Sequence, residues 1–170
     1  MYAFAAIEHA SRRIHILGAT PHPTTAWVVQ AAKNLVIDLE DNDSRARFMA
    51  RDRDGKLPEL FDATLADTGI DVVLSGIQMP SMNSIMEQWV QTCRHELLDR
   101  TLIWNQRHLL HALREFEQFY NEHRPHQGIA NARPLRPLPT PIVDPNKIAL
   151  LDIRRRDPIG GILHQYQHAA

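Results

Sequence analysis

The sequence predicts an α/β fold, because short segments rich in β-branched and aromatic residues alternate with longer segments whose apolar residues recur at helical spacing. Its 170 residues are enough for one domain with a sizeable core and a tail, and too few to favour two full domains. Hydrophobic residues make up 44% and charged residues 23% of the chain, which is typical of a globular protein and argues against disorder over most of the length.

The first elements that we expect are two strands joined as a hairpin. Residues 2–8 and 13–19 have strand composition, and a short polar link separates them. Pro21 then stops the second strand, and Thr24 or Thr25 can cap a helix. The apolar positions of that helix recur at helical spacing, and they are Val28, Ala31, Ala32, Leu35 and Leu39.

The middle of the chain continues the alternation. Residues 45–50 form a short candidate strand that delivers Asp52 at its C-terminal edge. A helix over residues 59–67 follows, and the β-branched residues at 70–74 suit a buried strand. A further helix is expected over residues 84–99, with one face lined by Met86, Val90, Cys93 and Leu97.

The last predicted helix of the core covers residues 106–122, and Pro125 ends it. Its apolar stripe contains Leu109, Leu113, Phe116 and Tyr120. Five prolines then mark an extended linker. We therefore predict one domain over residues 1–132, a proline-rich linker over 133–146 and a basic C-terminal tail over 147–170, the tail forming a small appendage such as a hairpin.

Composition narrows the class of protein. Cys93 is the single cysteine, so an internal disulfide and a multi-cysteine zinc site are excluded, and a reducing, cytoplasmic compartment is expected. No apolar run approaches the roughly 20 residues that a membrane helix needs. A formal net charge of -1 does not by itself indicate a nucleic-acid-binding protein, although arginines cluster locally, in residues 12–13, 45–53, 133–136 and 154–156.

Two carboxylates are candidates for metal chemistry. Asp52 lies at the end of a predicted strand, and Glu87 lies on a predicted helix with 34 residues between them. Magnesium binds a few carboxylates and keeps positions for water and phosphate oxygens, and such ions can drive in-line displacement at phosphorus. The alternative is a solvated surface pair, which by spacing alone is the commoner outcome.

Four motifs, in the same order along the chain, make the carboxylate pair more specific. They are Ile7-Glu8-x-x-Ser11-Arg12-Arg13-Ile14, Asp52-Arg53-Asp54-Gly55-Lys56-Leu57, Pro80-x-x-Asn83-x-x-x-Glu87 and Tyr120-Asn121-Glu122-His123-Arg124-Pro125-His126-Gln127-Gly128. Together they resemble the integrase catalytic core, the family of DDE transposases and retroviral-type integrases. The resemblance covers residues 2 to about 135.

This resemblance implies a ribonuclease H-like mixed sheet flanked by helices, and an Asp, Asp, Glu triad that uses Mg²⁺ or Mn²⁺ to cut and join DNA. By the motifs, Asp52 is the second acid and Glu87 the third, and both are predicted metal ligands. The first acid belongs to an opening strand that this chain lacks in most or all of its length. Glu8 matches an acidic residue that is not catalytic in the family. We therefore expect the chain alone to be weakly active or inactive.

The function implied by the resemblance is DNA integration or transposition by metal-dependent strand transfer. The implied partners are DNA and further copies of the chain assembled on DNA, with neither a membrane nor a small-molecule substrate. Predicted nucleic-acid contacts are Arg53, Lys56, Asn83 and Arg124. The alternative is a catalytically inactive DNA-binding or interaction remnant of a mobile element.

Other reactive residues favour structural roles. The pairs His108-x-x-His111 and His123-x-x-His126 could each offer two imidazoles to zinc, but packing and hydrogen bonding are the better interpretation. Cys93 lies on an apolar stripe, which suits a small core residue better than a nucleophile. The tryptophans favour core packing over base stacking, and they are Trp27, Trp89 and Trp104.

Overall fold

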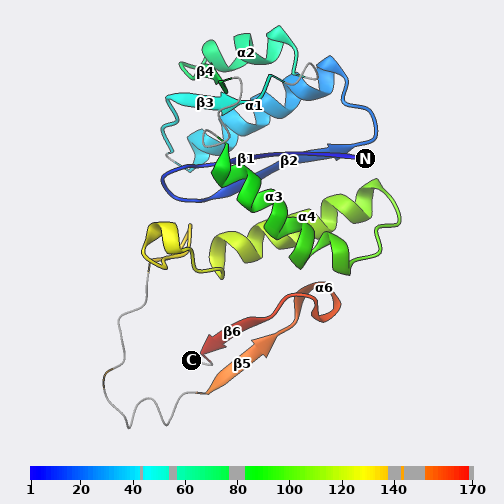
Figure 1. The fold of residues 1–170 in the computed structure, drawn as a ribbon, viewed down its shortest axis with the longest axis vertical. Coiled ribbons are helices and arrows are strands. Elements are labelled where there is room, and N and C mark those ends of the chain that lie inside the picture. Colours follow the sequence, from blue (N-terminus) through cyan, green and yellow to red (C-terminus); the bar gives the residue numbers. More distant parts are fainter. Residues whose placement is uncertain (43, 54–56, 77–82, 138–142, 144–151, 169–170) are drawn as a thin grey trace. The chain divides into compact units, whose positions relative to one another are not determined.

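The fold was analysed in a computed structural model, which describes residues 1–42, 44–53, 57–76, 83–137, 143 and 152–168 (Figure 1). The chain divides into two compact units. The first unit comprises Met1–Ala6 and His15–Val90, and the second comprises Ile7–Ile14 and Gln91–Ala170. Most of the predicted linker over residues 133–146 lies outside the described residues, so the predicted division into core, linker and tail stays a prediction.

The chain begins with the predicted hairpin. Strands β1 (Tyr2–Ile7) and β2 (Ile14–Thr20) form a two-stranded sheet. In the link between them the Glu8 amide donates to the Arg13 carbonyl at 2.8 Å, and the Ser11 hydroxyl donates to the Glu8 carboxylate at 2.6 Å. The Glu8 side chain therefore accepts a hydrogen bond within this turn.

Helix α1 (Thr25–Asp41) confirms both the predicted cap and the predicted stripe. The Thr24 side chain accepts a hydrogen bond from the Trp27 amide at 3.3 Å, which satisfies one of the amides that a helix start leaves unpaired. The five predicted apolar positions are buried, together with Val36. Helical spacing was thus enough to identify the buried face of this helix.

A parallel strand pair follows, joined by a helix. Strand β3 (Phe48–Arg51) pairs with β4 (Asp71–Leu74), and α2 (Glu59–Ala66) connects them. The prediction that β4 is a buried strand was wrong for most of its residues: Val73 and Leu74 are exposed, and only Val72 packs against the core. Alternate side chains of a strand face opposite sides, so Val73 lies on the side away from Val72. Leu74 lies on the same side as Val72, but it is the last residue of the strand and is 40% exposed.

One core holds the first unit together. Its buried side chains come from α1, from α2 and from the residue before β4: Val28, Ala32, Leu35, Val36, Leu39, Phe61, Leu65 and Ile70. Side chains from all four strands of this unit pack against it, namely Phe4 and Ala6, Leu17, Met49 and Val72. Both strand pairs therefore face the same two helices, which confirms the mixed α/β class. The described strands form three two-stranded sheets, and the single ribonuclease H-like sheet stays a prediction.

Helix α3 (Ser84–Glu96) runs from the first unit into the second, where η2 (Leu98–Arg100) and α4 (Gln106–Glu122) follow. The predicted bounds of α4 are confirmed, and its predicted stripe is buried. Asn105 caps it by accepting from the His108 amide at 2.9 Å.

Beyond α4 the elements are short. They are η3 (Gln127–Ile129), β5 (Ile153–Arg156), α6 (Pro158–Gly161) and β6 (Gln165–His168). Strands β5 and β6 pair antiparallel, which is the small hairpin expected in the tail.

Two predictions about apolar side chains were wrong. On α3 the inward positions are Trp89 and Cys93, and buried Leu97 directly follows the helix, whereas Val90 is 48% exposed. A helical period of 3.6 residues allows either neighbour to point inward, and the larger indole occupies the core. Trp104 was expected in the core but is 76% exposed, in the loop that precedes α4.

Within the described ranges, no helix combines the length and the apolar content that crossing a bilayer requires.

Candidate active site

Asp52 directly follows β3, as predicted, and its side chain is exposed. Its Oδ1 atom accepts hydrogen bonds from the Ser75 hydroxyl at 2.8 Å and from the Asn83 side-chain amide at 2.5 Å. Ser75 directly follows β4, and its amide donates to the Arg51 carbonyl at 2.8 Å. Because the carboxyl ends of parallel strands meet at one edge of the sheet, this pairing brings Asp52 and Ser75 together.

Asn83 connects this carboxylate to the helix that carries Glu87. The Asn83 carbonyl accepts a hydrogen bond from the Glu87 amide at 2.9 Å, which is the first turn of α3. The Asn83 side chain meanwhile donates to Asp52. Glu87 is exposed, and its negative charge is favourable near the N-terminus of a helix. The spacing Asn-x-x-x-Glu thus joins one carboxylate by a side-chain contact and presents the other one helical turn later.

Arg51 holds the end of β3 in place. Its Nε and Nη2 atoms donate to the two carboxylate oxygens of Asp62 on α2, at 2.8 and 2.6 Å. Its Nη1 atom donates to the Asp52 carbonyl at 2.9 Å. The Arg51 side chain is only 12% exposed, so this two-pronged pair is shielded from solvent and geometrically specific. Sequence reasoning counted Arg51 only as one of a cluster of arginines and did not assign this contact.

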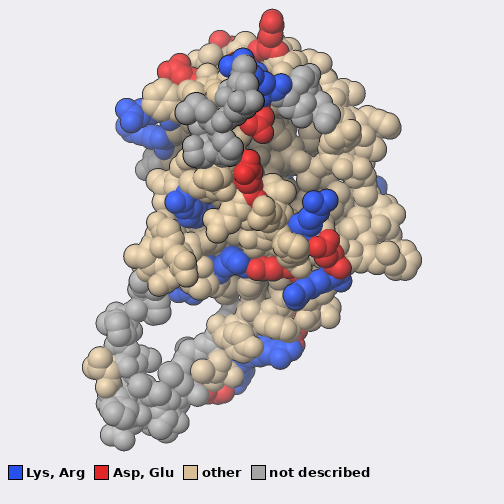
Figure 2. All heavy atoms as spheres, viewed as in Figure 1, with Lys and Arg blue, Asp and Glu red and all other residues tan. Residues whose placement is uncertain are grey.

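Three further residues near Asp52 were predicted to contact nucleic acid, and the structure describes only some of them. Arg53 is exposed, and its Nε atom donates to the Ser75 carbonyl at 3.2 Å. Lys56 and Pro80 lie outside the described residues. On the face drawn in Figure 2, Lys and Arg side chains are interspersed with Asp and Glu and do not merge into one basic area. The nucleic-acid contacts predicted for Arg53, Lys56 and Asn83 stay predictions.

The donor set at this edge suits a hard divalent cation by type, since carboxylate oxygens are the ligands that Mg²⁺ and Mn²⁺ prefer. In the part of the chain that the structure describes, no three His, Cys, Asp or Glu side chains gather into a group that could hold a metal ion. A metal role for Asp52 and Glu87 therefore stays a prediction, which rests on their chemistry and on the contact through Asn83.

The second unit brings two of the sequence motifs together. The Asn121 side chain accepts from the Ile14 amide and donates to the Ile14 carbonyl, both at 2.9 Å, and it is buried. A Cβ atom on Gly128 would lie 3.1 Å from Nη2 of Arg12, so the absent side chain leaves room for that guanidinium. The motif at residues 120–128 therefore holds the turn at residues 8–14 in place through hydrogen bonds and packing, which is a structural role.

The rest of that signature is also engaged within the second unit. Arg124 forms an ion pair with Glu96 on α3, and its guanidinium lies 5.9 Å from the centre of the Tyr120 ring. The ring centres of Tyr120 and His126 are 4.4 Å apart. Burial lowers the pKa of His126 below its ordinary value, which favours the neutral ring at pH 7. The contact with the Tyr120 ring gives His126 a packing role, and the DNA contact predicted for Arg124 stays a prediction.

Cys93 is buried and unsuited to nucleophilic chemistry. Burial, followed by the nearby Glu96 carboxylate, raises the pKa of its thiol to about 12. A thiol with this pKa has about a thousandfold less thiolate at neutral pH than one at the ordinary value. We expect Ellman's reagent to modify the native protein very slowly, and the protein unfolded in guanidinium at the rate of a free cysteine. Equal rates in the two states would contradict the burial of this thiol.

Comparison with known proteins bears on the same residues. Residues 68–134 match the model of the integrase core domain, and no curated protein matches the chain. The matched segment contains β4, Ser75, the Asn83–Glu87 turn and the signature at the end of α4. It does not contain Asp52, which the fold brings to it through hydrogen bonds. Residues 68–134 of this chain therefore match the integrase core domain family, which the ordered motifs predicted.

Proposed function

We propose that this protein takes part in DNA integration or transposition by metal-dependent phosphodiester strand transfer, with Asp52 and Glu87 as two of its metal-binding carboxylates. The observation that carries the proposal is the hydrogen bond from Asn83 to Asp52, which links the end of β3 to the first turn of the helix that presents Glu87. The integrase core match over residues 68–134 supports the same chemistry and makes DNA the expected partner.

The hydrogen bonds around Asp52 suggest how the site would work. Ser75 and Asn83 both donate to Oδ1, which would orient the carboxylate so that Oδ2 could bind a cation. Arg51 holds the backbone at this position through Asp62, so the carboxylate needs little reorganisation when a cation arrives. A bound Mg²⁺ or Mn²⁺ would supply charge stabilisation for the attacking and leaving oxygens of the phosphodiester.

We expect weak or no turnover from this chain alone. Asp52 and Glu87 together carry a charge of about -2, which neutralises only half of the charge of about +4 on the two divalent cations of a two-metal mechanism. Holding both cations therefore needs a further acidic group. The alternative function, a DNA-binding or interaction module without catalysis, uses the same surface and predicts no turnover under any condition.

Metal binding provides the first test, because it does not depend on activity. Electron paramagnetic resonance of Mn²⁺ titrated with protein should show binding that is lost in Asp52→Asn and in Glu87→Gln. Asp41→Asn and Glu40→Gln are matched controls, since both side chains are exposed at the end of α1 and make none of the contacts described around Asp52. Equal Mn²⁺ binding by all five proteins would remove the proposed metal site.

DNA binding and nicking provide the second test. We expect affinity for duplex DNA to fall steeply as salt rises, because phosphate neutralisation releases counterions. With a supercoiled plasmid and Mg²⁺ or Mn²⁺, we expect little nicking. Turnover that Asp52→Asn abolishes would overturn the expected inactivity while supporting the chemistry. Binding without any nicking favours the module, and absent or salt-independent binding rejects both functions.

A further inference from the structure

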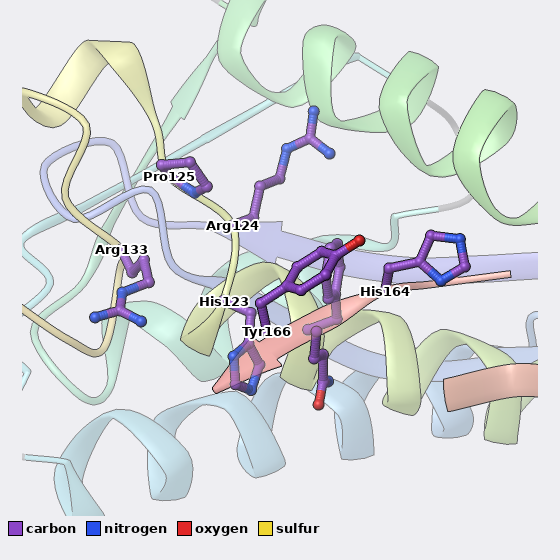
Figure 3. A pocket seen from close by; sticks show the side chains of 8 residues that line it. His123, Arg124, Pro125, Arg133, His164 and Tyr166 are labelled. Atoms are coloured by element: carbon purple, nitrogen blue, oxygen red, sulfur yellow. The ribbon is translucent and has the colours of Figure 1, made fainter. Parts of the chain in front are cut away.

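A cavity of about 390 Å³ lies in the second unit, outside the candidate active site (Figure 3). Its walls come from three segments: the C-terminal end of α4, the loop that follows it, and the region around the start of β6. The residues on which the argument rests are Phe119, His123, Arg133, His164 and Tyr166. Sequence reasoning did not place these residues together, because about 30 positions separate Arg133 from His164.

Planar side chains form part of the wall. The Phe119 and His123 rings are stacked, with their centres 6.4 Å apart and 22° between their planes. The Tyr166 ring projects from β6 and is largely exposed. A flat, partly apolar wall of this kind suits the face of a nucleobase, because any base can stack on an aromatic ring.

The charge of the lining is suited to a phosphate. No carboxylate is among the side chains that line the cavity within the described residues, whereas Arg133 and Arg124 both are. Arg124 is engaged with Glu96, and in Figure 3 its guanidinium extends away from that of Arg133. Arg133 is therefore the cation best placed to meet an anion.

The backbone presents Arg133 in a defined position. The amide of Arg133 donates to the carbonyl of Arg136 and the amide of Arg136 donates to the carbonyl of Arg133, both at 3.2 Å. Within the described ranges, the hydrogen bond of the Arg133 side chain is a long one, 3.5 Å, to the Pro137 carbonyl. A guanidinium on a fixed turn can bind phosphate oxygens in pairs.

The pKa of His123 is a second sign of positive charge around the cavity. The pKa of His123 is lowered, first by burial, and further by the nearby guanidinium groups of Arg136, Arg133 and Arg156, while Glu122 opposes them. Glu122 is itself paired with Arg136 at 3.0 Å. Arg133 and Arg156 thus add cationic charge around a cavity whose imidazole is favoured in its neutral form.

We infer that this cavity binds one unpaired nucleotide, with the base against Phe119, His123 and Tyr166 and the phosphate on Arg133. Paired bases in a duplex have their faces covered by stacking, so only a single-stranded or flipped nucleotide can enter. The volume falls within the range of about 300–1,000 Å³ that is usual for ligand pockets. The inference rests on the proposed DNA function and adds a site for an unpaired base in the second unit.

The test compares short fluorescein-labelled single-stranded DNA with the matching duplex by fluorescence anisotropy, using the full chain. Tyr166→Ala should weaken single-strand binding by about tenfold, the order expected for one stacked base. Arg133→Gln should weaken it by about tenfold as well, the order expected for one hydrogen bond to a charged group, and both variants should change duplex binding little. Arg100→Gln and Tyr2→Ala are matched controls, because both side chains are exposed and neither lines the cavity. Circular dichroism establishes that each variant is folded. If Arg133→Gln is not folded, Arg133→Lys is tested in its place, because it retains the positive charge.

The possible results separate this inference from the proposed function. The inference is overturned if the chain binds duplex DNA and if Arg133→Gln and Tyr166→Ala leave its binding of single-stranded DNA unchanged. That result leaves the proposed function standing. Arg133-dependent single-strand binding without duplex binding or metal binding supports the inference alone. A deoxynucleoside monophosphate that binds with the same dependence, while the single strand does not, supports the site with a free nucleotide as its ligand. Absence of binding by all three probes overturns it.

Discussion

Replacing Asn121 with alanine is expected to lower the free energy of unfolding by about 3 kcal/mol. The buried Asn121 side chain satisfies both the amide and the carbonyl of Ile14. Alanine leaves both backbone groups buried without a partner, and each such group costs about 1–3 kcal/mol. Urea denaturation followed by circular dichroism measures the change.

The matched control is Asn34→Ala. Asn34 also accepts a side-chain hydrogen bond, from Gln30 at 2.9 Å, but that contact is exposed. Water can replace the lost partner there, so a change within about 0.5 kcal/mol is expected. Similar losses in the two variants would show that the contact between Asn121 and Ile14 contributes no more than a surface hydrogen bond.

Replacing Phe61 with alanine should destabilise the first unit by about 4 kcal/mol, the usual cost of removing a large buried ring. Phe61 on α2 is 2% exposed, and its ring centre lies 5.8 Å from that of Phe4 on β1. Truncation removes apolar contacts and leaves a cavity between the helices and the strands. The free energy of unfolding in urea again provides the measurement.

Leu60 offers an internal control for this variant, because it precedes Phe61 in the same helix and is 55% exposed. Leu60→Ala removes a solvated side chain and keeps a good helix former, so we expect a change within about 0.5 kcal/mol. If Phe61→Ala were as mild as Leu60→Ala, the packing of α2 against the strands would be contradicted.

Local sequence signals predicted much of the fold. The bounds of α4 follow from an uninterrupted helical period and the stop at Pro125, and the structure adds the cap at Asn105. The hairpin and α1 follow from strand composition and the cap at Thr24. Such signals depend on residues a few positions apart, and these positions lie close in any fold that forms the element.

Such local signals were insufficient where either of two neighbouring side chains could have faced the core. On α3 either Trp89 or Val90 could face inward, and the choice belongs to the core that receives the larger ring. Trp104 was assigned to the core by its chemistry alone, yet it lies exposed in a loop. A periodicity or a propensity does not state which side of an element another element will cover.

The candidate site divides in the same way. Motif order by itself singled out Asp52, Asn83 and Glu87 as candidate site residues and led to the family whose model residues 68–134 match. Only the tertiary structure decided that Asn83 donates to Asp52, that Arg51 holds this position through Asp62, and that Arg133 and Tyr166 line one cavity. The physical reason is that these contacts join residues on different elements, whose separation is set by packing and pairing rather than by spacing along the chain.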